Sequence, residues 1–290
     1  MHVKTIARNH VLVKILVILT FLLLPALSAF AENCSNHIYC EDFDNNFAHS
    51  NWADWSSIGR YCQPYSGTNP ATDCEGQSSQ DYHSAPYSLR YTVEIGENDG
   101  GWPQLNFPQQ SASAWTYVRW YQKLETGYQL GSQLKGISMM GAGGTGFLWK
   151  FQIRQTYDIP AYLFDEHWHF GFHSYLGGEK FTGIHNPHAE EVIGAWHCYE
   201  VGVQPSTKSL KLWIDGVLKA NWTNSAFVED ATLGPNKLNV SCYYGYDADG
   251  ARSPKTQSYY IDNLVISNHY IGPRGDIPSI SPPTGLKIIQ

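Results

Sequence analysis

The sequence predicts an all-β fold, a sandwich or barrel of antiparallel strands. Short runs of alternating apolar and polar residues recur along the chain, and turn-forming residues separate them. No stretch keeps a helical apolar period over three turns. Numerous short strands without helices between them favour this class over an α/β fold.

Residues 1–31 have the features of a secretory signal peptide. A positively charged start is followed by the apolar run 15–28 and by the small-x-small pattern Ala29-Phe30-Ala31. The run is short for a membrane span, so we expect a secreted or periplasmic protein without membrane attachment after cleavage. Losing the three cations of the signal takes the formal charge from −7 to −10. This acidic balance argues against nucleic acid as a partner.

The mature chain is expected to hold one β domain, residues 32–272, and a Pro-rich tail, residues 273–290. A loop region rich in Ser, Asn, Gly and Pro is expected over residues 45–79. Asp215-Gly216, between two apolar runs, is the best hairpin signal. The expected strands are 38–43, 88–95, 115–124, 134–140, 147–155, 167–175, 196–203, 210–214, 238–244 and 258–267.

All six cysteines lie in the mature part. An even number in an exported protein predicts disulfides, although spacing alone does not fix their connectivity. Proximity favours Cys34–Cys40 and Cys62–Cys74, which leaves Cys198 with Cys242.

The two runs 147–155 and 167–175 each carry one polar face of unusual chemistry. Because strand side chains change face at every residue, alternate positions share a face. This face combines cations, an amide, imidazoles and a phenol, and it has no carboxylate, which favours a polyanion or a sugar as ligand. Its residues are Lys150, Gln152, Arg154, His167, His169, His173 and Tyr175.

Several segments resemble the concanavalin A-like jelly-roll superfamily. Residues 81–92 resemble a strand of jelly-roll carbohydrate-binding domains, and residues 115–123 followed by Lys135-Gly136 resemble secreted polysaccharide lyases of that superfamily. Residues 196–200, 212–216 and 260–267 match its last strands. The resemblance covers most of residues 38–272. It implies a jelly-roll β-sandwich of two curved antiparallel sheets, with a sugar polymer lying across the concave one.

The same fold hosts lectins, glycosidases, lyases and passive binding modules, so activity has to be argued from residues. The glucuronan-lyase-like and alginate-lyase-like branches are the most similar, through Lys135-Gly136. The Glu-x-Asp-x-x-Glu strand of laminarinase-type glycosidases is missing. We therefore expect a polysaccharide lyase acting on an acidic polysaccharide, with a non-catalytic carbohydrate-binding protein as the second interpretation and a glycoside hydrolase as the third.

Elimination needs a group that neutralises the C5 carboxylate, a base for the C5 proton and an acid for the departing O4. Arg154 suits the first role because its fork binds a carboxylate in two places. His169 or His173 is the candidate base, and Tyr243 or Tyr244 the candidate acid. Ion pairing of Arg154 and Lys150 with acids on a neighbouring strand is the structural alternative. The candidate substrate-binding residues are Arg119, Tyr121, Lys135, Lys150, Gln152, His167, Tyr175 and Trp102.

No cofactor is expected to be required for this chemistry, and a monomer is expected. Four acids at strand ends, where jelly-roll domains bind Ca²⁺, are candidate ligands of a structural calcium ion. Ordinary strand-end acids are the alternative for them, and the spacing of His167 and His169 gives a weaker zinc hypothesis. The candidate calcium ligands are Glu41, Asp42, Asp44 and Asp262.

Overall fold

The structure is a computed structural model. It describes residues 34–43, 52–53, 75–84, 87–93, 95–96, 99–101, 104–129, 133–141, 147–155, 168–174, 180–186, 193–225, 228, 232–244 and 253–274. The expected signal peptide and residues 275–290 of the expected tail lie outside this part of the chain. Within it, no helix has the length and apolar character needed to cross a membrane.

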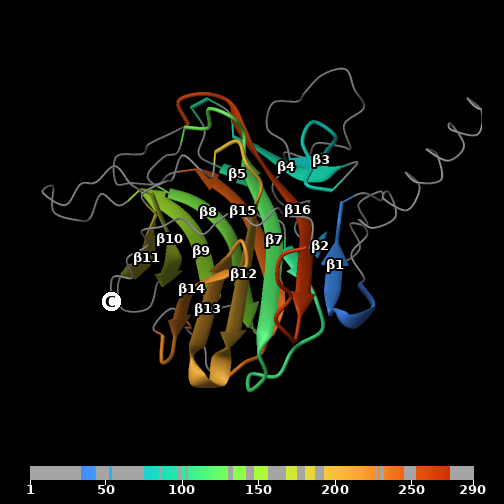
Figure 1. The fold of residues 1–290 in the computed structure, drawn as a ribbon, viewed down its shortest axis with the longest axis vertical. Helices are drawn as coiled ribbons and strands as arrows, with labels where there is room; N and C mark the ends of the chain where they lie inside the picture. The colour runs from blue at the N-terminus through green and yellow to red at the C-terminus, as the bar shows by residue number, and fades with distance from the viewer. Residues whose placement is uncertain are drawn as a thin grey trace, which may run out of the picture. The chain divides into compact units, whose positions relative to one another are not determined.

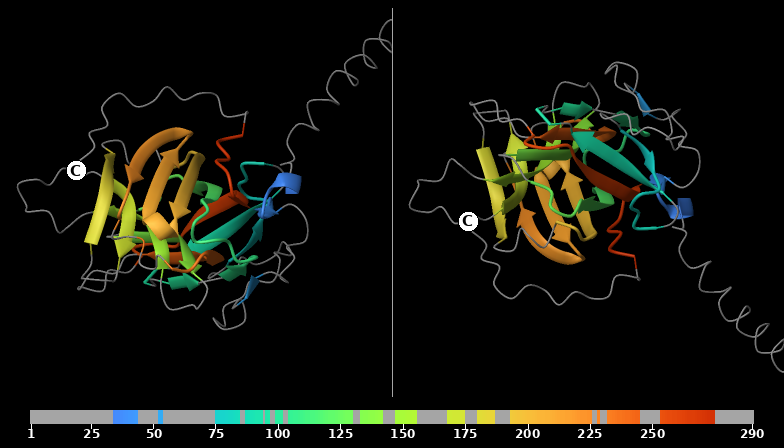
Figure 2. Two further views of the ribbon diagram at one scale, coloured as in Figure 1. Left: turned by 90° about the horizontal axis from the view of Figure 1, so that it is seen from below. Right: turned by 90° about the horizontal axis from the view of Figure 1, so that it is seen from above.

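The described residues form two antiparallel sheets, each of eight strands. In sheet A the order is β14-β13-β12-β7-β16-β4-β3, and β1 also pairs with β16. Figure 1 shows this sheet from β14 to β16, and Figure 2 gives two further views. The strands are β1 Tyr39–Glu41, β3 Glu75–Ser78, β4 Ser88–Val93, β7 Thr116–Leu124, β12 His197–Gln204, β13 Ser209–Ile214, β14 Val217–Trp222 and β16 Gln257–Ser267.

Sheet B has the order β11-β10-β9-β8-β15-β6-β2, and β5 pairs with β15. The described part of the chain also contains the short 3-10 helices Cys34–Asn36 and Pro205–Thr207. The strands of sheet B are β2 Trp52–Ala53, β5 Asp99–Gly101, β6 Gln104–Asn106, β8 Gln133–Gly141, β9 Phe147–Gln155, β10 Trp168–Ser174, β11 Lys180–Asn186 and β15 Pro235–Tyr244.

The core lies between the two sheets. Trp120 of β7, Tyr199 of β12 and Phe151 of β9 are each at most 1% exposed. Their rings meet across the two layers, with centroids 5.3 Å apart for Trp120 and Phe151 and 5.4 Å for Phe151 and Tyr199. Tyr91 of β4 adds a polar link, because its hydroxyl donates to the Val240 carbonyl of β15 at 3.2 Å. These contacts show that one apolar face of each sheet packs on the other, which confirms the all-β sandwich.

The hairpin predicted at Asp215-Gly216 joins β13 and β14. Both turn residues have positive φ, 50° and 75°, as a type I′ turn requires, and glycine adopts that conformation at little cost. The carboxylate of Asp215 also accepts the Cys198 backbone N–H at 2.8 Å, which ties the turn to β12.

Every expected strand is present in the structure, with small shifts of its bounds. The expected loop region contains two additional strands, β2 and β3. β6, β11 and β14 were also not expected as full strands. β11 has Gly183 at its centre and little apolar alternation, so its strand state depends on pairing with β10 rather than on its own pattern.

The cysteine prediction is confirmed in part. Cys34 and Cys40 are both disulfide-bonded. The Cys198–Cys242 pair is wrong, because Cys198 is a free, buried thiol in β12 of sheet A whereas Cys242 lies in β15 of sheet B. Cys62 and Cys74 lie outside the described residues.

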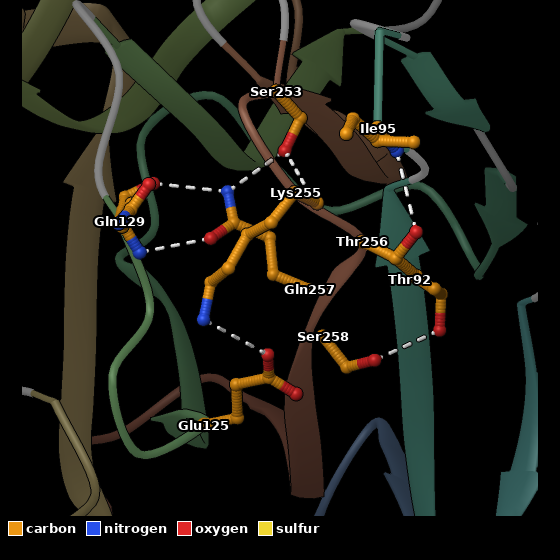
Figure 3. A network of polar contacts seen from close by, with 9 residues as sticks. All are labelled: Thr92, Ile95, Glu125, Gln129, Ser253, Lys255, Thr256, Gln257 and Ser258. Carbon is orange, nitrogen blue, oxygen red and sulfur yellow. Dashed lines mark hydrogen bonds and ion pairs between the residues drawn. The ribbon is translucent and has the colours of Figure 1, made fainter.

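A polar network fastens the turn that follows β7 to the start of β16 (Figure 3). The side chain of Gln257, 1% exposed, accepts the Gln129 N–H at 2.8 Å and donates to the Gln129 carbonyl at 2.9 Å. Its Nε2 also donates to the Ser253 hydroxyl at 3.0 Å. The Gln257 side chain thus bonds both backbone groups of Gln129, as a neighbouring strand would. It holds in place the turn between β7 of sheet A and β8 of sheet B.

Gln257→Ala is expected to lower the free energy of unfolding by about 1–3 kcal/mol, because it leaves the Gln129 backbone groups and Ser253 without this partner. Urea unfolding at fixed pH measures the change. Thr256→Ala, which removes only an exposed 3.3 Å bond to the Ile95 N–H, is the control, with an expected loss under about 0.5 kcal/mol. Equal losses in both variants would contradict the role given to Gln257.

Candidate functional site

One face of sheet B packs on the core and the other faces away from it, and β9 shows which residues belong to each. Phe151 faces the core, where it meets Trp120 and Tyr199. Because residues alternate along a strand, Lys150, Gln152 and Arg154 occupy the opposite face, called here the outer face of sheet B. The apolar and polar positions of β9 therefore alternate as the sequence predicts, and the cationic positions lie on the face away from the core.

Strand pairing aligns these positions with the other candidates in rows across the outer face. Arg154 pairs with His169 of β10 on one side and with Gln133 of β8 on the other, and His169 pairs with His185 of β11. Directly paired residues share a face and have Cβ atoms about 4.5–5.5 Å apart. The first row is thus Gln133, Arg154, His169 and His185.

The second row crosses the same strands one step along. Gln152 pairs with Lys135 of β8, and Lys135 pairs with Tyr243 of β15. Gln152 also pairs with Gly171, which itself pairs with Gly183. Two adjacent glycines leave this row without side chains over β10 and β11. The other members of this row are Lys135, Gln152 and Tyr243, a cation, an amide and a phenol respectively.

A third row lies on the other side of the second. Ser138 of β8 pairs with Lys150 of β9 and with Asn239 of β15, and Asn239 also pairs with Gln104 of β6. The register of β8 shifts between Lys135 and Ser138, as at a β-bulge. This bulge lets both residues lie in outer-face rows although they are three apart.

The register separates the two candidate acids. Tyr243 lies in the second row, whereas Tyr244 pairs with Leu134, which pairs with Ile153 in a row of the core-facing set. Tyr243 is the one of the two that shares a face with Arg154 and Lys135. His173 belongs to the same face as His169, four residues along β10. His167, Tyr175 and Trp102 lie outside the described residues.

Arg119 and Tyr121 do not join these rows. Both lie in β7 of sheet A and are at most 1% exposed. Arg119 donates through Nη1 to the Gly272 carbonyl at 3.2 Å, and the Tyr121 hydroxyl accepts the Arg274 N–H at 2.7 Å. This placement corrects the expectation that they extend the substrate-binding row, because alternation assigns a residue to a face but not to one of two sheets.

The segment 270–274 covers part of the outer face of sheet A through Glu200. This carboxylate, 1% exposed, accepts the N–H groups of Ile271 and Gly272, both at 2.8 Å. Burial raises the pKa of Glu200 to about 7, against the opposing effects of the two N–H bonds and of Arg119. Burial likewise raises the pKa of the neighbouring Cys198 thiol to about 12, so this cysteine is a poor nucleophile.

Two of the candidate calcium ligands, Asp262 and Glu41, already accept hydrogen bonds from protein groups. The carboxylate of Asp262, fully buried, accepts the N–H groups of His83, Ser84 and Asn263 at 2.7–2.9 Å. Glu41 accepts the Tyr39 hydroxyl and the Phe43 N–H. No three His, Cys, Asp or Glu side chains of the described residues come together as a metal site. Asp44 lies outside the described residues, so calcium binding, in which Asp42 is the fourth candidate, stays a prediction.

Sequence reasoning missed several members of the rows. Gln133 and His185 join Arg154 and His169 only through strand pairing, and β11 was not expected at all. Ser138 and Asn239 alternate along their strands with apolar residues of the core. This alternation was the one sequence signal that they lie on the outer face. Nothing in a single strand tells which residues of its neighbours stand beside it.

The chain was compared with known proteins. No family model matches it, and no curated protein is similar to it in sequence. An endo-β-1,4-glucuronan lyase from the fungus Trichoderma reesei is similar in structure, with 14% identity and a TM-score of 0.51 over 80% of this chain and 95% of that one. A variant of alginate lyase Aly36B, solved with alginate tetrasaccharide, has 14% identity and a TM-score of 0.50 over 68% of this chain and 88% of that one. At these identities the likeness concerns the fold, and this chain has the jelly-roll fold of these polysaccharide lyases.

Proposed function

We propose that this protein is an exported polysaccharide lyase that cleaves an acidic, uronate-containing polysaccharide by β-elimination. One observation carries the proposal. Outer-face rows of sheet B gather Arg154, Gln152, Lys135, His169 and Tyr243 on adjacent strands. None of β8, β9, β10, β11 and β15 contains Asp or Glu. A surface with this composition suits a polyanion, and it lacks the paired carboxylates that glycoside hydrolysis needs.

The reaction has three roles, and residues of the first and second rows fill them. Arg154, with Gln152 beside it, binds the C5 carboxylate and so makes the C5 proton acidic. His169, the direct neighbour of Arg154, takes that proton, since an ordinary imidazole is largely neutral at neutral pH. The C5–H electron pair forms the C4–C5 double bond, the C4–O4 bond breaks, and Tyr243 protonates O4. β10 and β15 are three strand spacings apart, about 14 Å, so the proposal requires His169 and Tyr243 to approach one sugar ring from opposite sides.

His173 is the alternative base, because it shares the outer face with His169. Lys135 pairs with Tyr243, and its positive charge stabilises the phenolate that forms when Tyr243 protonates O4. The phenolate regains a proton from solvent after each cycle, and the imidazolium of His169 releases the C5 proton. Lys150 extends the cationic surface for a further uronate. The partner is an anionic polysaccharide, and export fits the disulfide-bonded Cys34 and Cys40.

The test is to incubate the purified protein with a panel of uronate polymers and to follow the ultraviolet absorbance of the unsaturated uronate. The proposal expects one polymer to yield this product and Tyr243→Phe to abolish it. Binding of a uronate polymer without any unsaturated product would instead favour a carbohydrate-binding protein. Saturated reducing ends would favour a hydrolase.

A further inference from the structure

Two buried polar side chains stand next to each other in the outer-face rows of sheet B. Ser138 is fully buried and Asn239 is 4% exposed. They pair directly across β8 and β15. Their chain neighbours Ile137, Met139 and Leu238 belong to the core between the sheets. By alternation, Ser138 and Asn239 therefore belong to the same face as Lys150.

Neither group is satisfied within the protein. Ser138 Oγ and Asn239 Oδ1 are buried and have no hydrogen-bond partner. Leaving such atoms unpaired costs free energy, so native proteins supply a partner to nearly all of them. In sheet A, by contrast, Asp262 and Glu200 are fully engaged by backbone N–H groups. Thr116 Oγ1 in β7 of sheet A is also buried without a partner, but Ser138 and Asn239 are two such residues that pair directly across neighbouring strands. This pair falls in the rows to which the proposed function assigns the substrate.

We infer that Ser138 and Asn239 form a hydroxyl-recognising subsite on the outer face of sheet B, where the proposed function places the substrate. The inference rests on the proposed function, and it adds that one sugar unit is recognised through a ring hydroxyl. The Asn239 amide oxygen can only accept a hydrogen bond, whereas the Ser138 hydroxyl can donate or accept. A sugar hydroxyl satisfies both atoms at once. An ionised carboxylate cannot donate to Asn239, so the pair favours a ring hydroxyl and leaves the carboxylate to the cations.

The position of the pair fits a subsite next to the point of cleavage. Ser138 stands beside Lys150, which lies two residues along β9 from Gln152. Two residues of a strand span about 7 Å, a distance of the order of one sugar residue. A uronate held here would place its carboxylate near Lys150 and one ring hydroxyl over Ser138 and Asn239.

The test compares stability with affinity in Ser138→Ala and Asn239→Ala. Because Ser138 Oγ has no partner in the free protein, Ser138→Ala is expected to leave the melting temperature unchanged or slightly raised. Its Kd for a uronate tetrasaccharide, measured by calorimetry in the Tyr243→Phe background, is expected to rise about 5- to 20-fold, and Asn239→Ala at least as much. Thr116→Val is the matched control, since Thr116 Oγ1 in β7 of sheet A is also buried without a partner. It should leave the Kd unchanged.

The outcomes separate this inference from the proposed function. A lower melting temperature with an unchanged Kd in Ser138→Ala would mean that the pair holds a structural water, and it would overturn the inference while elimination still proceeds. If the protein binds a neutral oligosaccharide in a Ser138-dependent way and no uronate polymer, the subsite stands and the proposed function fails. Failure to bind any oligosaccharide overturns both.

Discussion

Arg154→Ala is expected to lower kcat for uronate-polymer cleavage by about 10²–10³-fold. The guanidinium neutralises a carboxylate that gains charge as the C5 proton leaves, so its largest effect falls on the transition state. Arg154→Lys is expected to recover only part of the rate, because an ammonium keeps the charge but lacks the planar fork.

Initial rates of unsaturated-product formation, with kcat and KM separated, measure this effect. Arg90→Ala is the matched control: Arg90 lies in β4 of sheet A, where its Nη1 donates to Gln80 Oε1 at 2.7 Å, and its loss should change kcat less than about twofold. A kcat for Arg154→Ala equal to that of the wild type would remove Arg154 from the mechanism.

The stability of the protein is expected to fall as the pH rises from about 4.5 to 7, through Glu200. The pKa of Glu200 is about 7 in the folded protein against an ordinary 4.5. The folded chain therefore keeps a proton that the unfolded chain releases. The contribution of Glu200 to the free energy of unfolding is fully present below about pH 4.5 and is lost as the pH rises through the folded pKa of about 7. The shift corresponds to about 3 kcal/mol.

Glu200→Gln cannot ionise, so its free energy of unfolding should change less with pH than that of the wild type, by about 3 kcal/mol over this interval. Urea unfolding at several pH values gives both curves, and their difference cancels the other titrating groups. The variant also loses one acceptor for the N–H groups of Ile271 and Gly272, which lowers its curve at every pH without changing the slope. Parallel curves for the two proteins would show that Glu200 does not carry the shift.

Much of the fold could be predicted from local patterns. The run 147–155 is a strand with these same bounds in the structure. Its alternating apolar residues are typical of a strand with one core-facing side, and Phe151 does pack in the core. β11 and the short β3 could not be predicted in this way. Their residues carry no apolar alternation, and they are strands because a neighbour supplies their hydrogen bonds.

The candidate site could be predicted less completely, for two physical reasons. Alternation places Arg119 and Arg154 each on a polar face, yet only strand order reveals that one lies in sheet A and is buried and that the other lies in sheet B. Cross-strand register is equally invisible in one sequence, so His185 and Ser138 were not linked to Arg154 and Lys150. The Cys198–Cys242 prediction failed for the first of these reasons.

A crystal structure of the Tyr243→Phe variant with a uronate tetrasaccharide tests the location of the site most directly. The oligosaccharide should cross β10, β9, β8 and β15 on the outer face of sheet B, with one carboxylate against Arg154 and one ring hydroxyl against Ser138 and Asn239. Density for the sugar on sheet A instead, or on sheet B without contact to Arg154, would contradict the account.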